Sequence, residues 1–153
     1  MPDAPPLPCA CASLRRASRA VTQLYESAFR GSGLRATQFT LLQVLERRGE
    51  VMQSQLGEIL AHDSTTLSRT LQPLRRRGWI RVHEGADRRE RYWSLTPRGK
   101  AQLERVRPRW LEAQRVLQQR IGGERWSTLL EALTLVANSA GVDEERASPG
   151  LRT

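Results

Sequence analysis

The sequence is poor in the residues that most enzymes, metal sites and membrane spans require. It contains two histidines and two cysteines, and aromatic residues make up 5% of its 153 residues. It has no glycine-rich phosphate loop and no spacing of histidines typical of a metal site, which argues against catalysis. No apolar run approaches the length of a membrane span, and residues 1–16 lack the apolar core of a signal peptide. We therefore expect a cytoplasmic protein that is not an enzyme, uses no cofactor and binds no membrane.

Lysine is almost absent, with Lys100 as its sole example, yet the chain is strongly basic. Lys and Arg number 25 against 16 Asp and Glu, which gives a formal charge of +9, and the pI is about 11.2. This balance favours a polyanionic partner, although solubility and genome composition also produce basic proteins. The length is that of one domain with a core of useful size.

The most informative segment, residues 63–99, places a polar helix, a tight turn and an arginine-rich hairpin in succession. Asp63 is a good N-cap, and leucines at helical spacing predict a buried stripe: Leu67, Leu71 and Leu74. Pro73 predicts a distorted last turn over residues 74–77, which Gly78 then closes.

The opposite face of this helix is polar. Short hydroxyls, an amide and a guanidinium can reach base edges and phosphates when such a helix lies in the major groove of DNA. We take seven residues as candidate contacts of a recognition helix: Ser64, Thr65, Thr66, Ser68, Arg69, Thr70 and Gln72.

A short hairpin with a charged tip follows the helix. Residues 79–83 and 92–95 are rich in β-branched and aromatic residues and predict its two strands. Arginines at such a tip suit the minor groove, where negative potential is concentrated. A carboxylate there needs a basic partner, and either of the two arginines after Asp87 would serve. The candidate wing contacts are Asp87, Arg88, Arg89 and Arg91.

Helices are also predicted before this segment. Apolar residues at helical spacing indicate one at about residues 9–31, a second at 37–49 and a third at 53–61. In the third helix, three residues are expected to face the core: Leu56, Ile59 and Leu60.

Two more helices are predicted after the hairpin. Thr96 followed by Pro97 is typical of a helix start, and this helix is long. Pro108 is expected to kink it, and a Gly-Gly pair at 122–123 ends it. The last helix is expected at about residues 124–140.

Five motifs follow one another in the central region: Ser68-Arg69, Gly78, Asp87-Arg88-Arg89, Leu95-Thr96 and Gly99. Their order and spacing resemble the MarR family of bacterial winged helix-turn-helix regulators. In that family the corresponding residues lie on the recognition helix, in the turn after it, on the wing and at the start of the next helix. The resemblance covers nearly the whole chain, from the first helix to about residue 140.

The resemblance implies a mainly α-helical fold with a small β-hairpin wing. It implies one domain over residues 9–140, in which residues 35–96 form a winged-helix DNA-binding lobe. The flanking helices, at 9–31 and 97–140, are implied to pair with those of a second subunit, and their apolar stripes exceed what one small lobe needs. Only the tails lie outside: residues 1–8, which contain four prolines and are expected to be disordered, and residues 141–153, which are expected to be flexible.

The implied function is sequence-specific binding of double-stranded DNA by a homodimeric transcriptional regulator. The most direct form is a repressor at a pseudo-palindromic operator, released by a small molecule or by a thiol-oxidising signal. The alternative is a non-sensing architectural protein that binds DNA or RNA, to which the basic charge alone also points. RNA readers usually present stacking aromatics on a sheet, whereas the wing tip offers arginines.

Cys9 and Cys11, near the start of the first helix, are the only cysteines. They are expected to be reduced in the cytoplasm, and two arginines one turn later favour the thiolate that oxidants attack. The segment from Cys11 to Ala20 resembles that of the organic-hydroperoxide-sensing branch of the family, but residues 34–39 lack the tyrosines of that branch. The pair can act as a thiol sensor, as part of an incomplete metal site, or as small structural residues.

The resemblance also implies a cleft for a small-molecule effector between the dimer helices and the lobe. Its candidate lining residues are Tyr25, Phe39 and Trp110. Each also fits an ordinary core aromatic at helical spacing, and the sequence does not indicate which ligand would bind.

Overall fold

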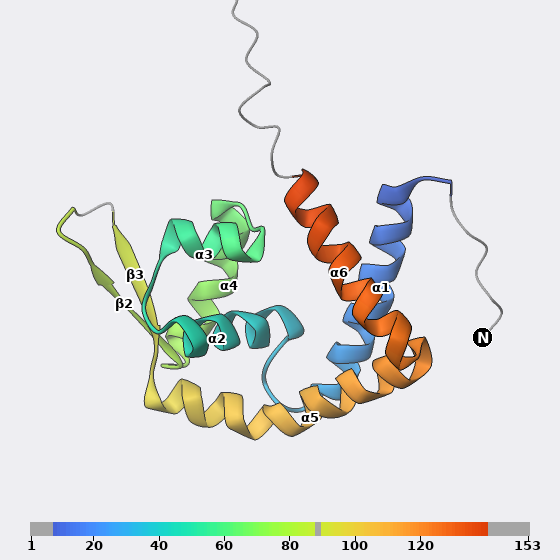
Figure 1. The fold of residues 1–153 in the computed structure, drawn as a ribbon. Helices are drawn as coiled ribbons and strands as arrows, with labels where there is room; N and C mark the ends of the chain where they lie inside the picture. Colours follow the sequence, from blue (N-terminus) through green and yellow to red (C-terminus); the bar gives the residue numbers. More distant parts are fainter. Residues whose placement is uncertain (1–7, 88–89, 141–153) are drawn as a thin grey trace, which may run out of the picture. The chain divides into compact units, whose positions relative to one another are not determined.

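The computed structural model describes residues 8–87 and 90–140, so both predicted tails lie outside the described residues except for Pro8. The chain divides into two compact units, residues 1–113 and 114–153. Helices and strands alternate in the order typical of a winged helix (Figure 1): α1 (Ala10–Ala28), α2 (Ala36–Arg48), β1 (Val51–Met52), α3 (Gln53–Leu60), α4 (Ser64–Arg76), β2 (Ile80–Glu84), β3 (Arg91–Leu95), α5 (Pro97–Ile121) and α6 (Gly123–Ala140). The predicted fold class, mainly helical with a small wing, is confirmed.

The wing is part of a three-stranded antiparallel sheet in the order β1-β3-β2. The hairpin strands pair from Ile80 opposite Leu95 to Glu84 opposite Arg91. β1 pairs with the other edge of β3 and was not predicted, because two residues are too few to show an alternating pattern. It anchors the hairpin, since the Trp93 Nε1 donates a hydrogen bond of 3.1 Å to Gln53 Oε1 just beyond β1.

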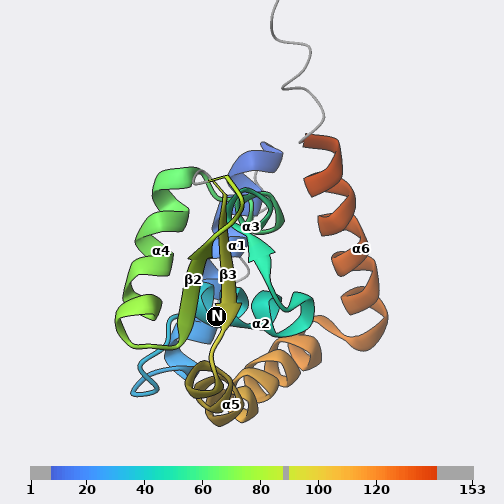
Figure 2. The same cartoon turned by 90° about the vertical axis from the view of Figure 1, so that its left-hand side faces the viewer.

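The core of the first unit lies between α2, α4, the sheet and the first half of α5. The predicted stripe of α4 is confirmed, since Leu67, Leu71 and Leu74 are all buried. Figure 2 shows α4 alongside β2, against which it packs. The remaining fully buried side chains come mainly from α2 and α5: Phe39, Leu41, Leu42, Leu45, Leu103 and Val106.

Ile59 does not face the core as predicted, because its side chain is 45% exposed. α3 has eight residues and ends where Ala61 adopts a left-handed conformation. At about 100° per residue, Leu56, Gly57 and Leu60 fall within one arc of about 100°, and Ile59 lies outside it. Leu56 and Gly57 are buried and Leu60 is half-buried, so this arc is the inner face of α3.

The two internal prolines do not interrupt their helices. α4 continues through Pro73 to Arg76, so residues 74–76 are helical rather than the predicted distorted end. The predicted stop at Gly78 is confirmed: its φ is +69°, its N–H donates to the carbonyl of Arg75 (2.8 Å), and the next N–H reaches the carbonyl of Leu74 (3.0 Å). This pair of bonds is a Schellman motif, which satisfies the last carbonyls of the helix. α5 likewise continues through Pro108.

α5 begins as predicted, with Thr96 as its cap. The Thr96 Oγ1 accepts a hydrogen bond from the Gly99 N–H (3.0 Å) and donates to the carbonyl of Gly78 (2.7 Å). The first turn of α5 thereby lies directly on the end of α4. A Cβ atom added to Gly99 would lie 2.0 Å from the carbonyl oxygen of Trp79, so only glycine permits this approach.

No helix among the described residues is both long and apolar enough to cross a membrane.

We predict that Gly99→Ala destabilises the protein by about 2 kcal/mol or more, because the new methyl group meets backbone that cannot move aside cheaply. Chemical denaturation followed by circular dichroism measures the change. Gly123→Ala is the matched control: it lies at the first residue of α6, has nothing within 4 Å of an added Cβ, and is expected to change stability by no more than about 0.5 kcal/mol. Equal stability of the two variants would contradict the close approach.

Candidate nucleic-acid interface

α4 presents a continuous polar surface on the side away from its buried leucines. Six of the seven predicted recognition residues are exposed, and Thr70 is half-buried. Ser64, Thr65, Ser68, Arg69 and Gln72 make no side-chain hydrogen bond or ion pair with the described part of the chain. A guanidinium and an amide that stand in solvent without a protein partner retain their full hydrogen-bonding capacity for another molecule.

Asp63 holds the start of this surface in place. Its Oδ1 accepts a hydrogen bond from the Thr66 N–H and its Oδ2 accepts one from the Thr66 hydroxyl, both at 2.8 Å. The bond from the Thr66 backbone, followed by that from its hydroxyl, holds the pKa of Asp63 below its usual range. The predicted N-cap is confirmed, and the Thr66 hydroxyl is therefore engaged within the helix.

Thr70 is also engaged within the helix, since its hydroxyl donates to the carbonyl of Thr66 (3.0 Å). Both threonines keep lone pairs that can accept a bond, but their donors are in use. The side chains that keep unpaired donors are therefore those of Ser64, Thr65, Ser68, Arg69 and Gln72.

The strands of the wing are braced by side chains on one face, because Arg81 and His83 lie two residues apart on β2 and point the same way. The Arg81 Nε donates to the Ser94 Oγ across β2 and β3 (3.0 Å). The His83 ring stacks on that of Tyr92 with 5.5 Å between ring centroids, and its Nδ1 lies 3.3 Å from a carboxylate oxygen of Glu50. The base of the wing is thus a fixed platform beside α4.

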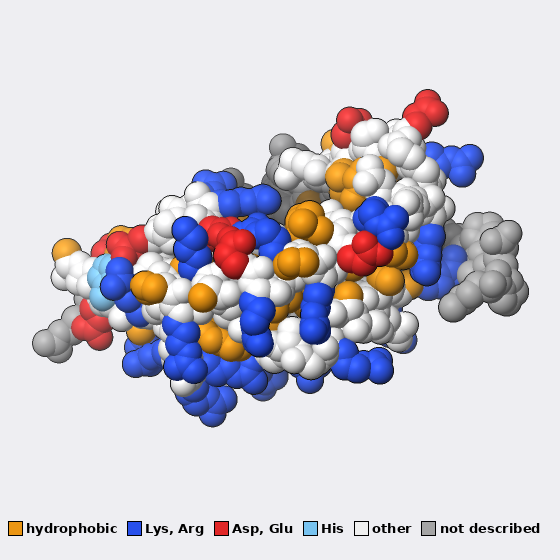
Figure 3. Space-filling model, turned by 90° about the horizontal axis from the view of Figure 1, so that it is seen from below, with side chains coloured by type: hydrophobic (Ala, Val, Ile, Leu, Met, Phe, Trp, Pro, Cys, Tyr) orange, Lys and Arg blue, Asp and Glu red, His pale blue; other side chains and the backbone are white. Residues whose placement is uncertain are grey.

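The tip of the wing is only partly described. Asp87 and Arg91 are exposed, and the Glu90 N–H donates to the carbonyl of Asp87 (2.9 Å). Arg88 and Arg89 lie outside the described residues, and so does the predicted pairing of Asp87 with one of them. On the face seen in Figure 3, basic side chains gather along the lower edge of the part that carries the wing. The polar surface of α4 and the wing therefore belong to a strongly basic lobe.

The three predicted effector residues line one pocket of about 200 Å³ in the first unit, formed by Tyr25, Phe29, Ala36, Phe39, Thr40 and Trp110. The Phe39 ring stacks on Trp110 at 5.9 Å and contacts Phe29 at 5.0 Å, between ring centroids. Burial raises the pKa of Tyr25 above its usual range. Phe29 was missed, although its spacing of four residues from Tyr25 places both on one side of the chain where α1 ends. That a ligand enters this pocket stays a prediction.

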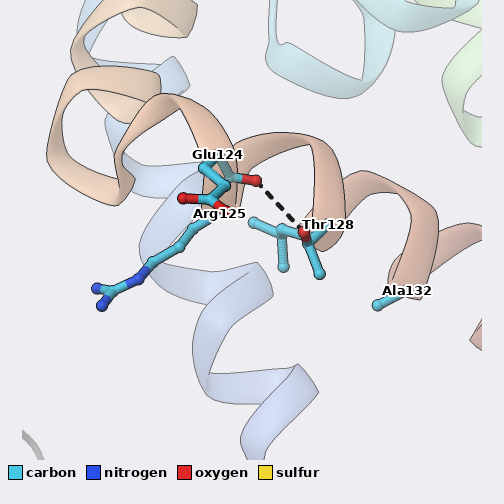
Figure 4. Close-up of a pocket in the computed structure, with 5 residues that line it drawn as sticks. Glu124, Arg125, Thr128 and Ala132 are labelled. Atoms are coloured by element: carbon cyan, nitrogen blue, oxygen red, sulfur yellow. Dashed lines mark hydrogen bonds between the residues drawn. The ribbon is translucent and has the colours of Figure 1, made fainter.

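A second hollow, on α6, is lined by one helix alone (Figure 4): Glu124, Arg125, Thr128, Leu129 and Ala132. The Thr128 hydroxyl donates to the carbonyl of Glu124 at 3.3 Å. A surface with no second wall cannot enclose a small molecule, so we assign it no ligand.

Cys9 and Cys11 are both exposed free thiols. Cys9 is the N-cap residue of α1, and its carbonyl accepts a hydrogen bond from the Ser13 N–H (3.0 Å). Among the described residues, no group of three or more His, Cys, Asp or Glu side chains is arranged to hold a metal ion. The thiols are accessible to a reagent in solution.

The helices predicted to dimerise carry apolar side chains that the described chain leaves uncovered. α1 has no buried residue, and α6 has none among residues 123–139, where burial is described. The large exposed hydrophobic side chains on α1, α5 and α6 are Leu14, Leu111, Leu130, Leu133, Leu135 and Val136. Exposed apolar faces of this kind are typical of surfaces that pack against another chain.

A profile described as the MarR family matches residues 32–90. The M. tuberculosis transcriptional regulator MosR, solved in complex with DNA, is 34% identical, and the match covers 89% of this chain and 98% of that chain with a TM-score of 0.81. A probable transcriptional regulator from Pseudomonas aeruginosa is 28% identical, with 84% and 97% of the two chains covered and a TM-score of 0.76. YwoH, an uncharacterized HTH-type transcriptional regulator of Bacillus subtilis (strain 168), is 23% identical over 99 residues, which are 65% of this chain and 72% of YwoH.

We predict that Asp63→Ala lowers the melting temperature at pH 7, and that the difference in melting temperature between parent and variant becomes smaller toward pH 3. A carboxyl whose pKa is lowered by folding stabilises the protein above the ordinary value of about 4, and this stabilisation is lost as the pH falls through the lower folded-state value. Melting curves of parent and variant at pH 7, 5 and 3 measure the difference. Asp63→Asn is the control, since its neutral cap should give a nearly constant offset. A deficit for Asp63→Ala that does not change with pH would refute the charged cap.

Proposed function

Because this chain belongs to the MarR family of winged-helix, DNA-binding transcriptional regulators, we propose that it is a homodimeric repressor of a pseudo-palindromic operator that releases DNA in response to a small molecule or a thiol oxidant. The observation that carries the proposal is the outward side of α4, where Ser68, Arg69 and Gln72 are exposed and unpaired in the described structure. The family consists of regulators rather than enzymes.

In the proposed complex, α4 lies in the major groove. Arg69 suits a guanine, whose O6 and N7 accept a bidentate pair of hydrogen bonds, and Gln72 suits an adenine. The shorter side chains of Ser64, Thr65 and Ser68 reach phosphates or base edges close to the helix. Thr66 and Thr70 contribute mainly as acceptors and through their methyl groups, because their hydroxyl protons are used within the helix.

The wing is proposed to contact the minor groove next to the site read by α4. Arg88 and Arg89 supply positive charge at its tip, with Arg91 at the start of β3, and Asp87 orients a neighbouring arginine. These contacts are made to the DNA backbone and depend on the width of the minor groove, so they contribute more to affinity than to sequence preference.

Homodimerisation is supported by the uncovered apolar side chains of α1, α5 and α6. Pairing these helices about a twofold axis would bury them and place two recognition helices on successive half-sites about one turn of DNA apart. The operator is then expected to be pseudo-palindromic.

Two features support a signal-responsive regulator. The pocket beside Phe39 and Trp110 is walled by aromatic rings and opens where α1 ends and α2 begins, so it suits a small, mostly apolar molecule. The exposed thiols of Cys9 and Cys11 offer a second input. A thiolate attacks the distal oxygen of a hydroperoxide, the O–O bond breaks, and the leaving alkoxide takes a proton from water, which gives a cysteine sulfenic acid and an alcohol.

We predict that Arg69→Ala and the wing variants weaken DNA binding in different ways. Arg69→Ala removes a base contact, so it should cost about 1–3 kcal/mol on the best site and relax preference at one position. Arg88→Ala and Arg89→Ala remove backbone charge, so each should weaken binding to all sequences and reduce the salt slope by about one. Fluorescence anisotropy with an operator selected from a random duplex pool, at several salt concentrations, measures both effects. If both wing variants bind like the parent at moderate salt, the wing assignment is wrong.

We predict that peroxide, hypochlorite or a quinone releases the parent protein from its selected operator but leaves the Cys9→Ser/Cys11→Ser variant bound. The serine variant keeps the size and polarity at both positions and removes the oxidisable sulfur. Gel-shift titrations before and after oxidant, followed by reduction with a thiol, measure the release and its reversal. Equal release of parent and variant would eliminate the thiol input.

A further inference from the structure

The loop that joins α1 to α2, residues 29–35, is held by side chains from two other helices. The Gln102 Nε2 and the Arg105 Nη2, both on α5, donate to the carbonyl oxygen of Ser32 at 2.8 and 3.1 Å. Arg109, one turn further along α5, donates to the carbonyl of Arg30 at 2.7 Å. Three side chains of one helix thus bind two carbonyls of a short loop, although the two segments are more than 65 residues apart in sequence.

A further carbonyl of this loop, that of Gly33, accepts a hydrogen bond from a residue at the end of α4. Arg77, the C-cap residue of α4, donates a hydrogen bond from its Nη1 to the carbonyl oxygen of Gly33. Its guanidinium also lies over the Trp79 ring, with 4.9 Å from the guanidinium carbon to the ring centroid. Gly33 has a φ of +79°, and a Cβ added there would lie 3.7 Å from the Arg77 Nη1 and 3.9 Å from the Trp79 ring. The three residues are therefore in close contact.

Trp79 extends this contact to α5. The residue is 8% exposed, and its carbonyl oxygen accepts a hydrogen bond of 3.0 Å from the N–H of Thr96, directly before the first turn of α5. The guanidinium of Arg77 is thus placed between the Trp79 ring and a loop carbonyl, and it uses its planar face and one N–H group at the same time. An ammonium group can donate a hydrogen bond but has no planar face.

We propose that Arg77 is a positioning residue for DNA recognition: its contact with Gly33 and Trp79 sets the orientation of α4 relative to the α1–α2 loop and α5. The proposal rests on the function proposed above, in which α4 reads the bases. Arg77 follows the 13 residues of α4, so it lies about 20 Å from the capped start of the helix at Asp63. Over that length a tilt of about 5° displaces one end by nearly 2 Å, which is enough to break hydrogen bonds to base edges.

Positioning differs in a measurable way from a direct contact between Arg77 and a phosphate. A phosphate contact depends on charge, so lysine would replace arginine and the salt slope would fall by about one when the charge is removed. A positioning contact depends on the planar guanidinium, which lies over Trp79 while one of its N–H groups reaches Gly33, so lysine would fail and the salt slope would stay the same. A misplaced α4 also loses specific contacts while it keeps non-specific attraction to the backbone.

The experiment compares Arg77→Met and Arg77→Lys with Arg76→Met as the matched control. Arg76 lies one residue earlier, is exposed, and makes no side-chain hydrogen bond or ion pair within the described chain. Removing it therefore deletes the same charge without the contact. Each full-length protein is titrated into an operator selected with the parent and into a duplex of random sequence at several salt concentrations, and thermal melting verifies the fold.

The expected result is that both Arg77 variants bind the operator about tenfold more weakly, the size of one lost base contact, with the parent's salt slope and the parent's affinity for random duplex. Arg76→Met should show at most a small, salt-dependent loss on both DNAs. The proposal would be overturned if Arg77→Lys bound the operator like the parent. It would also be overturned if Arg77→Met and Arg76→Met lost the same affinity for both DNAs. A parent protein that selects no operator would overturn the proposed function itself.

Hydrogen exchange without DNA gives an independent readout. The amides of residues 31–34 should exchange faster in Arg77→Met than in Arg76→Met, since only the first variant releases the Gly33 carbonyl. Equal exchange in the two variants would show that Arg77 does not hold the loop, whatever the DNA titrations give.

Discussion

The burial of one leucine stripe determines which residues of α4 face outward, and these are the residues proposed to contact DNA. Leu67, Leu71 and Leu74 lie in the core at successive turns of α4, so the rotation of that helix about its own axis cannot change without exposing them. The polar residues between them are turned outward as a consequence. The Asp63 cap at one end and the Gly78 turn at the other then determine where the helix begins and ends. The wing, the α1–α2 loop and the start of α5 are all placed against this helix.

Much of this arrangement was predictable because its signals are local. The leucine spacing, the Asp63 cap, the Thr96-Pro97 start of α5 and the glycine stop after α4 each depend on residues within one or two turns. The two incorrect predictions, for Ile59 and Pro73, relied on local sequence rules where contacts with the core decide the outcome. Ile59 is apolar and lies at helical spacing from Leu56. However, α3 has only eight residues, and the side of it that contacts the core carries Leu56 and Gly57 but not Ile59. Proline usually disrupts the interior of a helix. Here Leu71 and Leu74, on either side of Pro73, are buried in the core, and α4 continues to Arg76.

Long-range contacts could not be predicted in the same way. β1 exists because Val51 and Met52 lie beside β3, more than 35 residues later in the chain. The hydrogen bond from Arg77 to the Gly33 carbonyl could not be predicted from the sequence, because every residue has a backbone carbonyl and residue type does not indicate which one Arg77 binds. Phe29 lies four residues after Tyr25, so helical spacing could have suggested it, but only the structure brings it together with Phe39 and Trp110. The candidate recognition residues were named from sequence, but the distinction between the engaged hydroxyls of Thr66 and Thr70 and the unpaired Arg69 and Gln72 required the structure.

The most direct test of the central claim, that a twofold pair of α4 helices reads duplex DNA, is hydroxyl-radical footprinting of the protein on an operator selected from a random pool. The account predicts two protected segments related by approximate dyad symmetry, centred about one helical turn apart on the same face of the duplex. A single protected segment, or uniform weak protection that does not depend on sequence, would contradict it.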